Sequence, residues 1–259
     1  METITCLWIQ KKLDNTSIIC LNSWLKLNYN VKIYTYTIGF RNEWINTEYD
    51  KQVEICDANE IYELEIPLTE ITTYEFISDK FRFILLRDNK IKKEKIIWLD
   101  TDQFLIRRMK TNNNFVAGQH TLQKGAFKHK DKVAIPTIFA MCFDGTENVD
   151  WEKILKEGKP NTAYQSGNLK RFEKEIAKTN LMLEPEIFAP IHWAWAKDIY
   201  TRCDIENRMK YGLKPIEYCS MSNNKNIIGI HLWRQMVKRN KWKITNNSIY
   251  NQLRGKVVV

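Results

Sequence analysis

The hydrophobic pattern of the first hundred residues alternates between short apolar runs and longer amphipathic stretches. Runs of β-branched and apolar residues predict three strands, at Thr3–Ile9, Val31–Ile38 and Ile96–Leu99. Between them, apolar side chains recur every three or four residues and predict three helices, at Thr16–Leu27, Ala58–Tyr62 and Thr73–Arg87. This alternating order of strands and helices predicts an α/β fold with a Rossmann-like, mostly parallel central sheet flanked by helices.

The pattern continues less regularly in the rest of the chain. A strand is predicted at Val133–Phe143, a helix at Asn168–Lys178, and a last strand at Ile227–Leu232, followed by a basic tail. No repeat, low-complexity tract or Pro/Gly-rich linker interrupts the sequence, so we expect a single domain over residues 1–259. Ligands of open α/β sheets bind beyond the carboxyl ends of the strands, which directs attention to the residues after Ile9, Ile38, Leu99 and Ile230.

Two carboxylates follow the strand predicted at Ile96–Leu99. The sequence there is Asp100-Thr101-Asp102, and acids this close repel unless a cation or hydrogen-bond donors lie nearby. Carboxylates are hard oxygen ligands that suit Mg²⁺ or Mn²⁺, and such ions often bridge to substrate phosphates. The alternative is a solvated turn. The position directly after an apolar strand favours the metal site.

Asp79 and Arg82 lie three residues apart on the preceding predicted helix, opposite its apolar stripe. They form either an exposed intrahelical ion pair or a functional pair, in which the carboxylate binds a hydroxyl group and the guanidinium contacts phosphate or sugar.

His231 lies at the end of the last predicted strand and precedes Trp233, Arg234, Lys238 and Arg239. A histidine here is either structural or a group that completes a metal site, while the basic residues place positive charge on a diphosphate.

Composition and charge narrow the class of protein. With 44% hydrophobic residues the chain is globular, and its six cysteines form no C-x-x-C pair, so we expect buried free thiols. No apolar run spans a bilayer and the start does not resemble a signal peptide, which predicts a soluble, cytoplasmic protein.

The net charge of +9 favours anionic partners. A nucleic-acid-binding protein, a nucleotidyltransferase and a non-catalytic glycan-binding remnant remain alternatives, although the first lacks a recognisable binding motif and the second a Gly-rich phosphate loop.

An ordered set of short motifs resembles the sugar transferases with a DXD sugar-binding region. The set comprises Ile4–Ile9, Asn22-Ser23-Trp24, Val31–Tyr34, Ser78-Asp79-x-x-Arg82, Leu99–Asp102, Phe188–Ile191 and His231-Leu232-Trp233. Two features depart from that family. Lys92–Lys95 stands where a Gly-Gly pair is usual, and Ser166-Gly167-Asn168 replaces a Gly-Pro. The first departure makes the chain partly similar to glycogenin-type transferases.

The resemblance implies a GT-A fold and a set of roles. Asp102 would ligate Mn²⁺ or Mg²⁺ directly, with Asp100 on the ribose, the sugar or the metal, and His231 as a further metal or diphosphate contact. Asp79 and Arg82 would hold the donor sugar, and Trp8 would stack on the nucleobase. The implied donor site consists of Cys6, Leu7, Trp8, Tyr36, Ser78, Asp79, Arg82, Asp100, Thr101, Asp102, His231, Trp233 and Lys238.

The resemblance also implies partners and a stereochemical course. The donor would be a nucleotide diphosphate sugar, with UDP-hexose favoured over GDP-mannose, and the acceptor a glycan or glycoconjugate rather than a specific nucleic acid. Residues 1–110 would bind the donor, and residues 111–259 would form the acceptor side and the C-terminal metal and diphosphate segment. The family retains the anomeric configuration. Four acids are candidates for the base that inversion needs, and none lies in a motif typical of such a base: Asp144, Glu147, Glu184 and Glu186.

Overall fold

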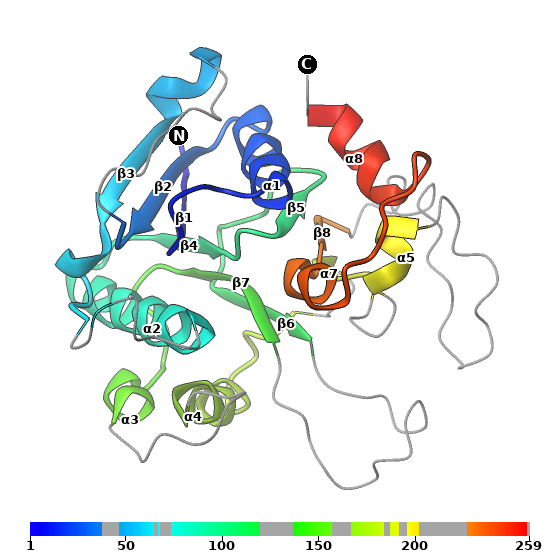
Figure 1. Cartoon of the computed structure of the whole chain (residues 1–259). Coiled ribbons are helices and arrows are strands. Elements are labelled where there is room, and N and C mark those ends of the chain that lie inside the picture. Colours follow the sequence, from blue (N-terminus) through cyan, green and yellow to red (C-terminus); the bar gives the residue numbers. More distant parts are fainter. Residues whose placement is uncertain are drawn as a thin grey trace, which may run out of the picture.

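A computed structural model describes residues 1–37, 47–64, 67, 74–119, 137–156, 167–183, 187–191, 196–201 and 227–257. Its centre is a six-stranded sheet with the order β3-β2-β1-β4-β7-β6 (Figure 1). The strands are β1 (Thr3–Leu7), β2 (Asn30–Thr35), β3 (Val53–Asp57), β4 (Ile96–Leu99), β6 (Phe115–Gln119) and β7 (Thr137–Phe143). The first four are parallel, whereas β7 runs antiparallel to both β4 and β6. The mixed α/β fold with a mostly parallel central sheet is therefore confirmed.

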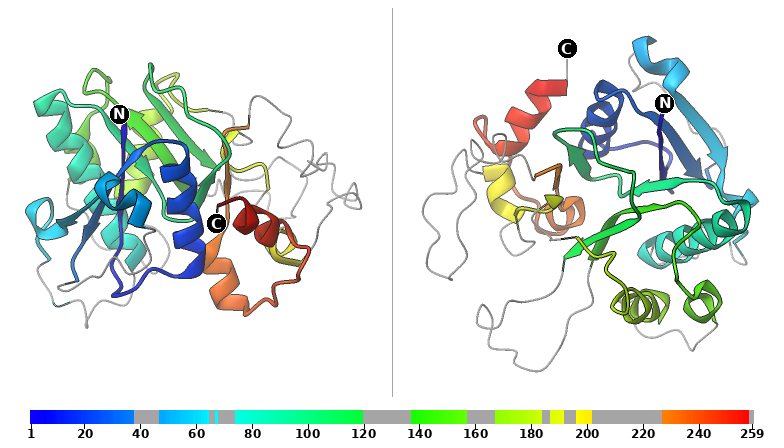
Figure 2. Two further views of the ribbon diagram at one scale, coloured as in Figure 1. Left: turned by 90° about the horizontal axis from the view of Figure 1, so that it is seen from above. Right: turned by 180° about the vertical axis from the view of Figure 1, so that it is seen from behind.

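Helices cover both faces of the sheet (Figures 1 and 2). On one face lie α2 (Tyr74–Lys92), α3 (Trp151–Leu155) and α4 (Gly167–Ile176), packed through a stack of Phe83, Phe172 and Trp151. On the other lie α1 (Asn15–Lys26), α5 (Ala196–Thr201), α7 (Arg234–Asn240) and α8 (Ile249–Val257). Two short 3-10 helices, η1 (Thr47–Gln52) and η2 (Ala58–Glu60), flank β3. Two hydrophobic clusters result, one on each face.

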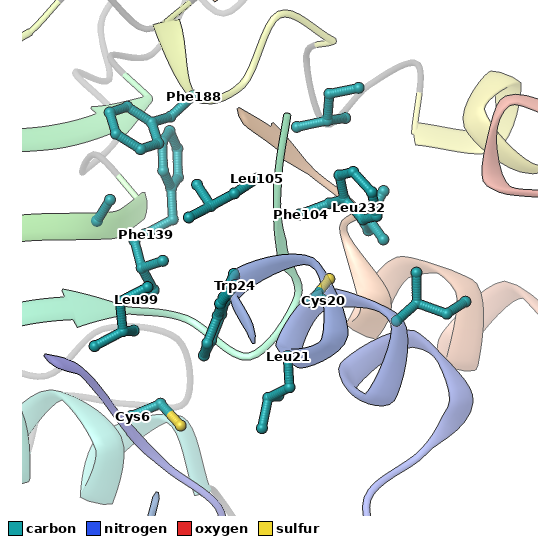
Figure 3. Packing of buried hydrophobic residues seen from close by; sticks show 14 of the residues in the cluster. Cys6, Cys20, Leu21, Trp24, Leu99, Phe104, Leu105, Phe139, Phe188 and Leu232 are labelled. Atoms are coloured by element: carbon teal, nitrogen blue, oxygen red, sulfur yellow. The ribbon is translucent and has the colours of Figure 1, made fainter. Parts of the chain in front are cut away.

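The core around α1 brings the carboxyl end of β4 close to that helix. Asp14 caps α1 by accepting a hydrogen bond from the backbone of Ser17, and Trp24 on the inner face of the helix is fully buried. The indole Nε1 of Trp24 donates to the carbonyl of Gln103 at 2.7 Å, just after the Asp100–Asp102 turn. Figure 3 shows Trp24 among Leu99, Phe104, Leu105 and Phe139. This packing fixes the chain on both sides of that turn.

A second, two-stranded sheet lies outside the central one. In it β5 (Gln103–Leu105) pairs antiparallel with β8 (Gly229–His231), with Gln103 opposite His231. The last predicted strand therefore belongs to a separate sheet and is not part of the central one. A Cβ at Gly229 would lie 2.5 Å from the side chain of Gln103 and 2.7 Å from the carbonyl of Phe104, so the pairing needs glycine.

Other differences from the predicted elements have simple causes. Charged residues, Glu54 and Asp57, interrupt β3, which is an edge strand and only partly buried, so no apolar run predicted it. Helix α2 continues to Lys92, beyond its apolar stripe, and the expected basic tail contains α7 and α8. Residues 38 and 133–136, assigned to strands by their pattern, lie outside the described residues.

The described helices include none that is long and apolar enough to cross a membrane. Of the cysteines in the described ranges, Cys6, Cys20 and Cys142 are buried free thiols, as expected, and Cys56 is a partly exposed free thiol. Cys203 and Cys219 fall outside those ranges.

Candidate metal and donor site

The Asp100–Asp102 turn stands at the carboxyl edge of β4. The backbone N–H of Asp100 donates to Phe139 of β7 at 2.9 Å, and that of Gln103 donates back to the carbonyl of Asp100 at 2.9 Å. The chain therefore leaves β4 through a tight turn and enters β5 directly. Two carboxylates are held on that turn, in the position that the sequence predicted.

His231 completes a cluster with these two acids. Ligand atoms of Asp100, Asp102 and His231 all lie within 4.8 Å of one another. The pairing of β5 with β8 brings the histidine there, and the N–H of Leu232 donates to the carbonyl of Asp102 at 2.8 Å. The imidazole Nε2 lies 3.5 Å from Asp102 Oδ1. Carboxylate oxygens and an imidazole nitrogen form a donor set that fits Mn²⁺.

Two further observations test this fit. Burial raises the pKa of Asp100, with Arg82 opposing and Asp102 adding to the rise, so a cation would relieve the cost of keeping this carboxylate charged. The buried Nε2 of His231 has no hydrogen-bond partner among the described residues, while Nδ1 accepts from the N–H of Trp233 at 3.1 Å. A neutral ring that accepts at Nδ1 carries its proton on Nε2. In this orientation Nε2 can donate to an oxygen, and it can ligate a metal only after losing that proton.

Asp79 and Arg82 are buried, with 8% and 5% of their surfaces exposed, so the interpretation as an exposed ion pair is wrong. The two side chains form a salt bridge, and Arg82 Nη1 also donates to the carbonyl of Ile138 at 2.9 Å. The same nitrogen lies 3.4 Å from Asp100 Oδ1, which also accepts from the indole of Trp98 at 3.1 Å. Helix α2 therefore supplies an ionic network that reaches Asp100 of the candidate metal cluster.

Trp8 lies just beyond the carboxyl end of β1, and only 3% of its surface is exposed. Its indole Nε1 donates to the carbonyl of Lys12 at 3.1 Å, and the guanidinium of Arg234 lies over the ring at 4.6 Å. The backbone N–H of Arg234 donates to Asp102 Oδ2 at 3.0 Å. Trp8 is therefore near the cluster, but Arg234 covers its ring.

Asp14 is a charged group of this region that the sequence did not single out. Its Oδ2 lies 3.1 Å from Arg234 Nη1 and 2.9 Å from Lys238 Nζ. The local sequence indicates only a helix cap. Its second role depends on residues more than two hundred positions away, which no local pattern reveals.

The other residues assigned to the donor site are mostly packed. Cys6, Leu7 and Thr101 are buried, and Ser78 is half-buried. Tyr36 is buried as well, and its hydroxyl donates to the carbonyl of Tyr62 at 2.8 Å. Trp233 packs against His231 with ring centroids 4.3 Å apart, and its Nε1 donates to Ile191 at 2.8 Å. The described contacts link Trp233 to the cluster and give no such link for Tyr36.

Comparison with known proteins identifies a glycosyltransferase region in the C-terminal part of the chain. Residues 165–257 match the protein family described as the alpha 1,4-glycosyltransferase conserved region. The matched stretch contains His231, Arg234 and Lys238, whereas Asp100 and Asp102 precede it. No curated protein matches the chain. The match agrees with the resemblance drawn from the motifs. The chain is accordingly a glycosyltransferase of the GT-A fold class, with the alpha 1,4-glycosyltransferase conserved region in its C-terminal part.

Proposed function

We propose that this enzyme transfers a hexose from a nucleotide diphosphate sugar to a hydroxyl group of a glycan, using Mn²⁺ or Mg²⁺ bound at the cluster of Asp100, Asp102 and His231. The observation that carries the proposal is the cluster of these three side chains at the carboxyl end of β4. A divalent cation there would neutralise the charge that develops on the leaving diphosphate. UDP-hexose is the favoured donor and GDP-mannose the alternative.

Asp102 is the principal ligand in this proposal, because the C-terminal segment fixes both its backbone and its carboxylate. Its carbonyl accepts from Leu232 and its Oδ2 from Arg234. His231 lies beside it and either ligates the metal or donates from Nε2 to a diphosphate oxygen. The two roles predict different Mn²⁺ affinities for the variant His231→Asn, which electron paramagnetic resonance measures without nucleotide. A ligand role lowers that affinity and a diphosphate contact leaves it unchanged.

Asp79 and Arg82 orient the donor sugar in this proposal. Their mutual salt bridge and the bond from Arg82 to Ile138 restrict both side chains before any ligand arrives. A preorganised pair loses little conformational entropy when it meets sugar hydroxyl groups. Residues 111–259 would supply the acceptor side.

Retention through front-face attack is the proposed course, in which the leaving phosphate takes the proton of the acceptor hydroxyl. Inversion needs a base opposite the leaving group. Asp144 directly follows Phe143, which pairs with Ile96 at the start of β4, whereas Asp100 follows the end of that strand. Asp144 therefore stands opposite residue 95, five positions from Asp100, which at roughly 3.3 Å per residue is about 17 Å along the strand.

Glu147 follows on the same side, where its carboxylate binds the indole of Trp151 at 2.9 Å. Glu184 and Glu186 lie outside the described residues. The positions of Asp144 and Glu147 thus argue against these two acids as the base, which agrees with the proposed front-face attack. The anomeric configuration of the first-formed product, read by NMR, tests this mechanism, and an inverted product contradicts it.

The experiment that tests the function is a panel of nucleotide-sugars incubated with the enzyme and Mn²⁺, scored for donor hydrolysis. Many transferases slowly hydrolyse their own donor, so no acceptor need be known. We expect hydrolysis of at least one UDP- or GDP-sugar, lost in excess chelator and restored by Mn²⁺. Full activity in excess chelator would contradict the metal site, and failure with every donor would contradict the proposed donor class.

A further inference from the structure

Three charged side chains meet next to Trp8. Arg234 and Lys238 of α7 both bind Oδ2 of Asp14, at 3.1 and 2.9 Å. A single carboxylate oxygen thus serves a guanidinium and an ammonium together. A guanidinium and an ammonium group can surround a phosphate oxygen in the same way, because both donate charge-assisted hydrogen bonds to a concentrated negative charge. Asp14 therefore occupies the place of an anionic ligand.

Asp14 is anchored, whereas its partners are long side chains. Its other oxygen accepts from the N–H of Ser17 at 3.0 Å and caps α1. Burial raises the pKa of Asp14, but Arg234, Ser17 and Lys238 outweigh that effect and hold the pKa below its usual value. The carboxylate is thus charged and fixed. Lys238 is 41% exposed and can turn toward a ligand.

The two cations lie next to the candidate metal cluster. The backbone N–H of Arg234 donates to Asp102 Oδ2, so its guanidinium is within one side-chain length of the cluster. The same guanidinium covers the ring of Trp8 at 4.6 Å. A diphosphate with one end at Asp102 would reach toward this pair of cations, and a nucleobase could not stack on the covered face of Trp8 until Arg234 moved.

We propose that Asp14 is an internal anion of the donor site, which holds Arg234 and Lys238 in the empty enzyme and yields them to the diphosphate when a donor binds. The inference rests on the proposed function. One movement of Arg234 would then serve two purposes, since it brings positive charge to the diphosphate and uncovers Trp8 for the base. In the reverse direction Asp14 recaptures the cations, weakens the hold on the product nucleotide and promotes its release.

Asp14→Asn tests the inference because asparagine also caps helices and removes only the charge. Calorimetric titration with UDP and with GDP, each with Mn²⁺, should show tighter binding by roughly threefold to tenfold, since partly exposed ion pairs each change an equilibrium constant only a few-fold. Asp14→Ser, another neutral capping residue, should behave alike. Arg234→Ala should weaken binding instead.

Asp150→Asn is the matched control. Asp150 also caps a helix, α3, through a 3.0 Å bond from the backbone of Lys153, and the substitution makes the same change in net charge away from the site. It should leave the nucleotide affinity unchanged. Weaker binding in Asp14→Asn would show that Asp14 positions the cations rather than competing for them, and unchanged binding would show that the diphosphate does not use them. Either result overturns the inference while the donor assignment stands. If the unaltered enzyme binds neither nucleotide, the proposed function itself fails.

Discussion

Two ionic networks flank Asp102, and they differ in burial. The network on α2 joins Asp79, Arg82 and Asp100, of which Asp79 and Arg82 are 8% and 5% exposed, and Arg82 also binds a backbone carbonyl. The network on α7 joins Asp14, Arg234 and Lys238 near the surface, with the carboxylate 28% exposed. A buried network keeps one geometry because breaking it leaves an unpaired charge without water. A partly exposed network can exchange partners at little cost. In the proposed mechanism, the site thus combines a rigid side that binds the sugar with an exchangeable side that binds the diphosphate.

The largest effect on activity is expected from Asp102, which lies between the two networks and is the proposed metal ligand. Asp102→Asn should lower donor hydrolysis by at least about a thousandfold, a loss of roughly 4 kcal/mol of transition-state stabilisation. Asp100→Asn should lower it less, because Arg82 and Trp98 already bind Asp100. Initial rates over a range of Mn²⁺ concentrations measure both losses. Equal rates in Asp102→Asn and the unaltered enzyme would remove Asp102 from the mechanism.

Arg82→Met and Arg234→Met compare the two networks directly. Arg82→Met removes the positive charge that faces Asp79 and Asp100 and should lower the free energy of unfolding by about 3–5 kcal/mol. Arg234→Met should lower it by less than about 1 kcal/mol, because water reaches its partner Asp14. Urea denaturation followed by circular dichroism measures both. Similar losses in the two variants would mean that burial does not distinguish the networks.

Trp8 lies at the boundary of the exchangeable network. If a base stacks on its ring after Arg234 moves, Trp8→Ala should weaken binding of UDP or GDP by about 1–3 kcal/mol. Trp8→Phe should recover part of that affinity, because a smaller aromatic face remains. Calorimetry on variants that keep the native circular dichroism spectrum measures the loss. A lower melting temperature with unchanged affinity would assign Trp8 to packing alone.

The smallest effect concerns pH. The pKa of Asp14 is lower in the folded chain than in the unfolded one, so its ion pairs stabilise the fold above the unfolded value near 3.9. That stability disappears as the pH falls through the lower, folded pKa. The contribution should be less than about 1 kcal/mol because the carboxylate is partly exposed. Thermal melts of the unaltered enzyme and Asp14→Asn between pH 7 and 3 should therefore converge at the acidic end, and a constant difference would contradict the shift.

Structural features that depend only on residues close together in the sequence could be predicted from it. The Asp100–Asp102 turn follows a four-residue apolar strand whose bounds were predicted correctly, and α1 begins and ends within one residue of its expected positions. The pairing of β8 with β5 was missed, because the period of a strand does not identify its partner. The contact between Asp14 and Arg234 joins residues 220 positions apart, and nothing near either residue indicates it. Burial of Asp79 and Arg82 likewise depends on β4 and β7, which the helical pattern does not contain.

The pairing of Gln103 with His231 also sets the order in which the site can arise during synthesis. The turn that carries Asp102 and the following strand β5 are complete soon after residue 105, but His231 is made more than a hundred residues later. At roughly 5–20 residues per second, that interval is on the order of ten seconds. During this time the ribosome-bound chain presents two neighbouring carboxylates and the unpaired edge of β5, without the C-terminal segment that covers them. A nascent chain therefore cannot bind donor in the proposed manner until its last strand has been added.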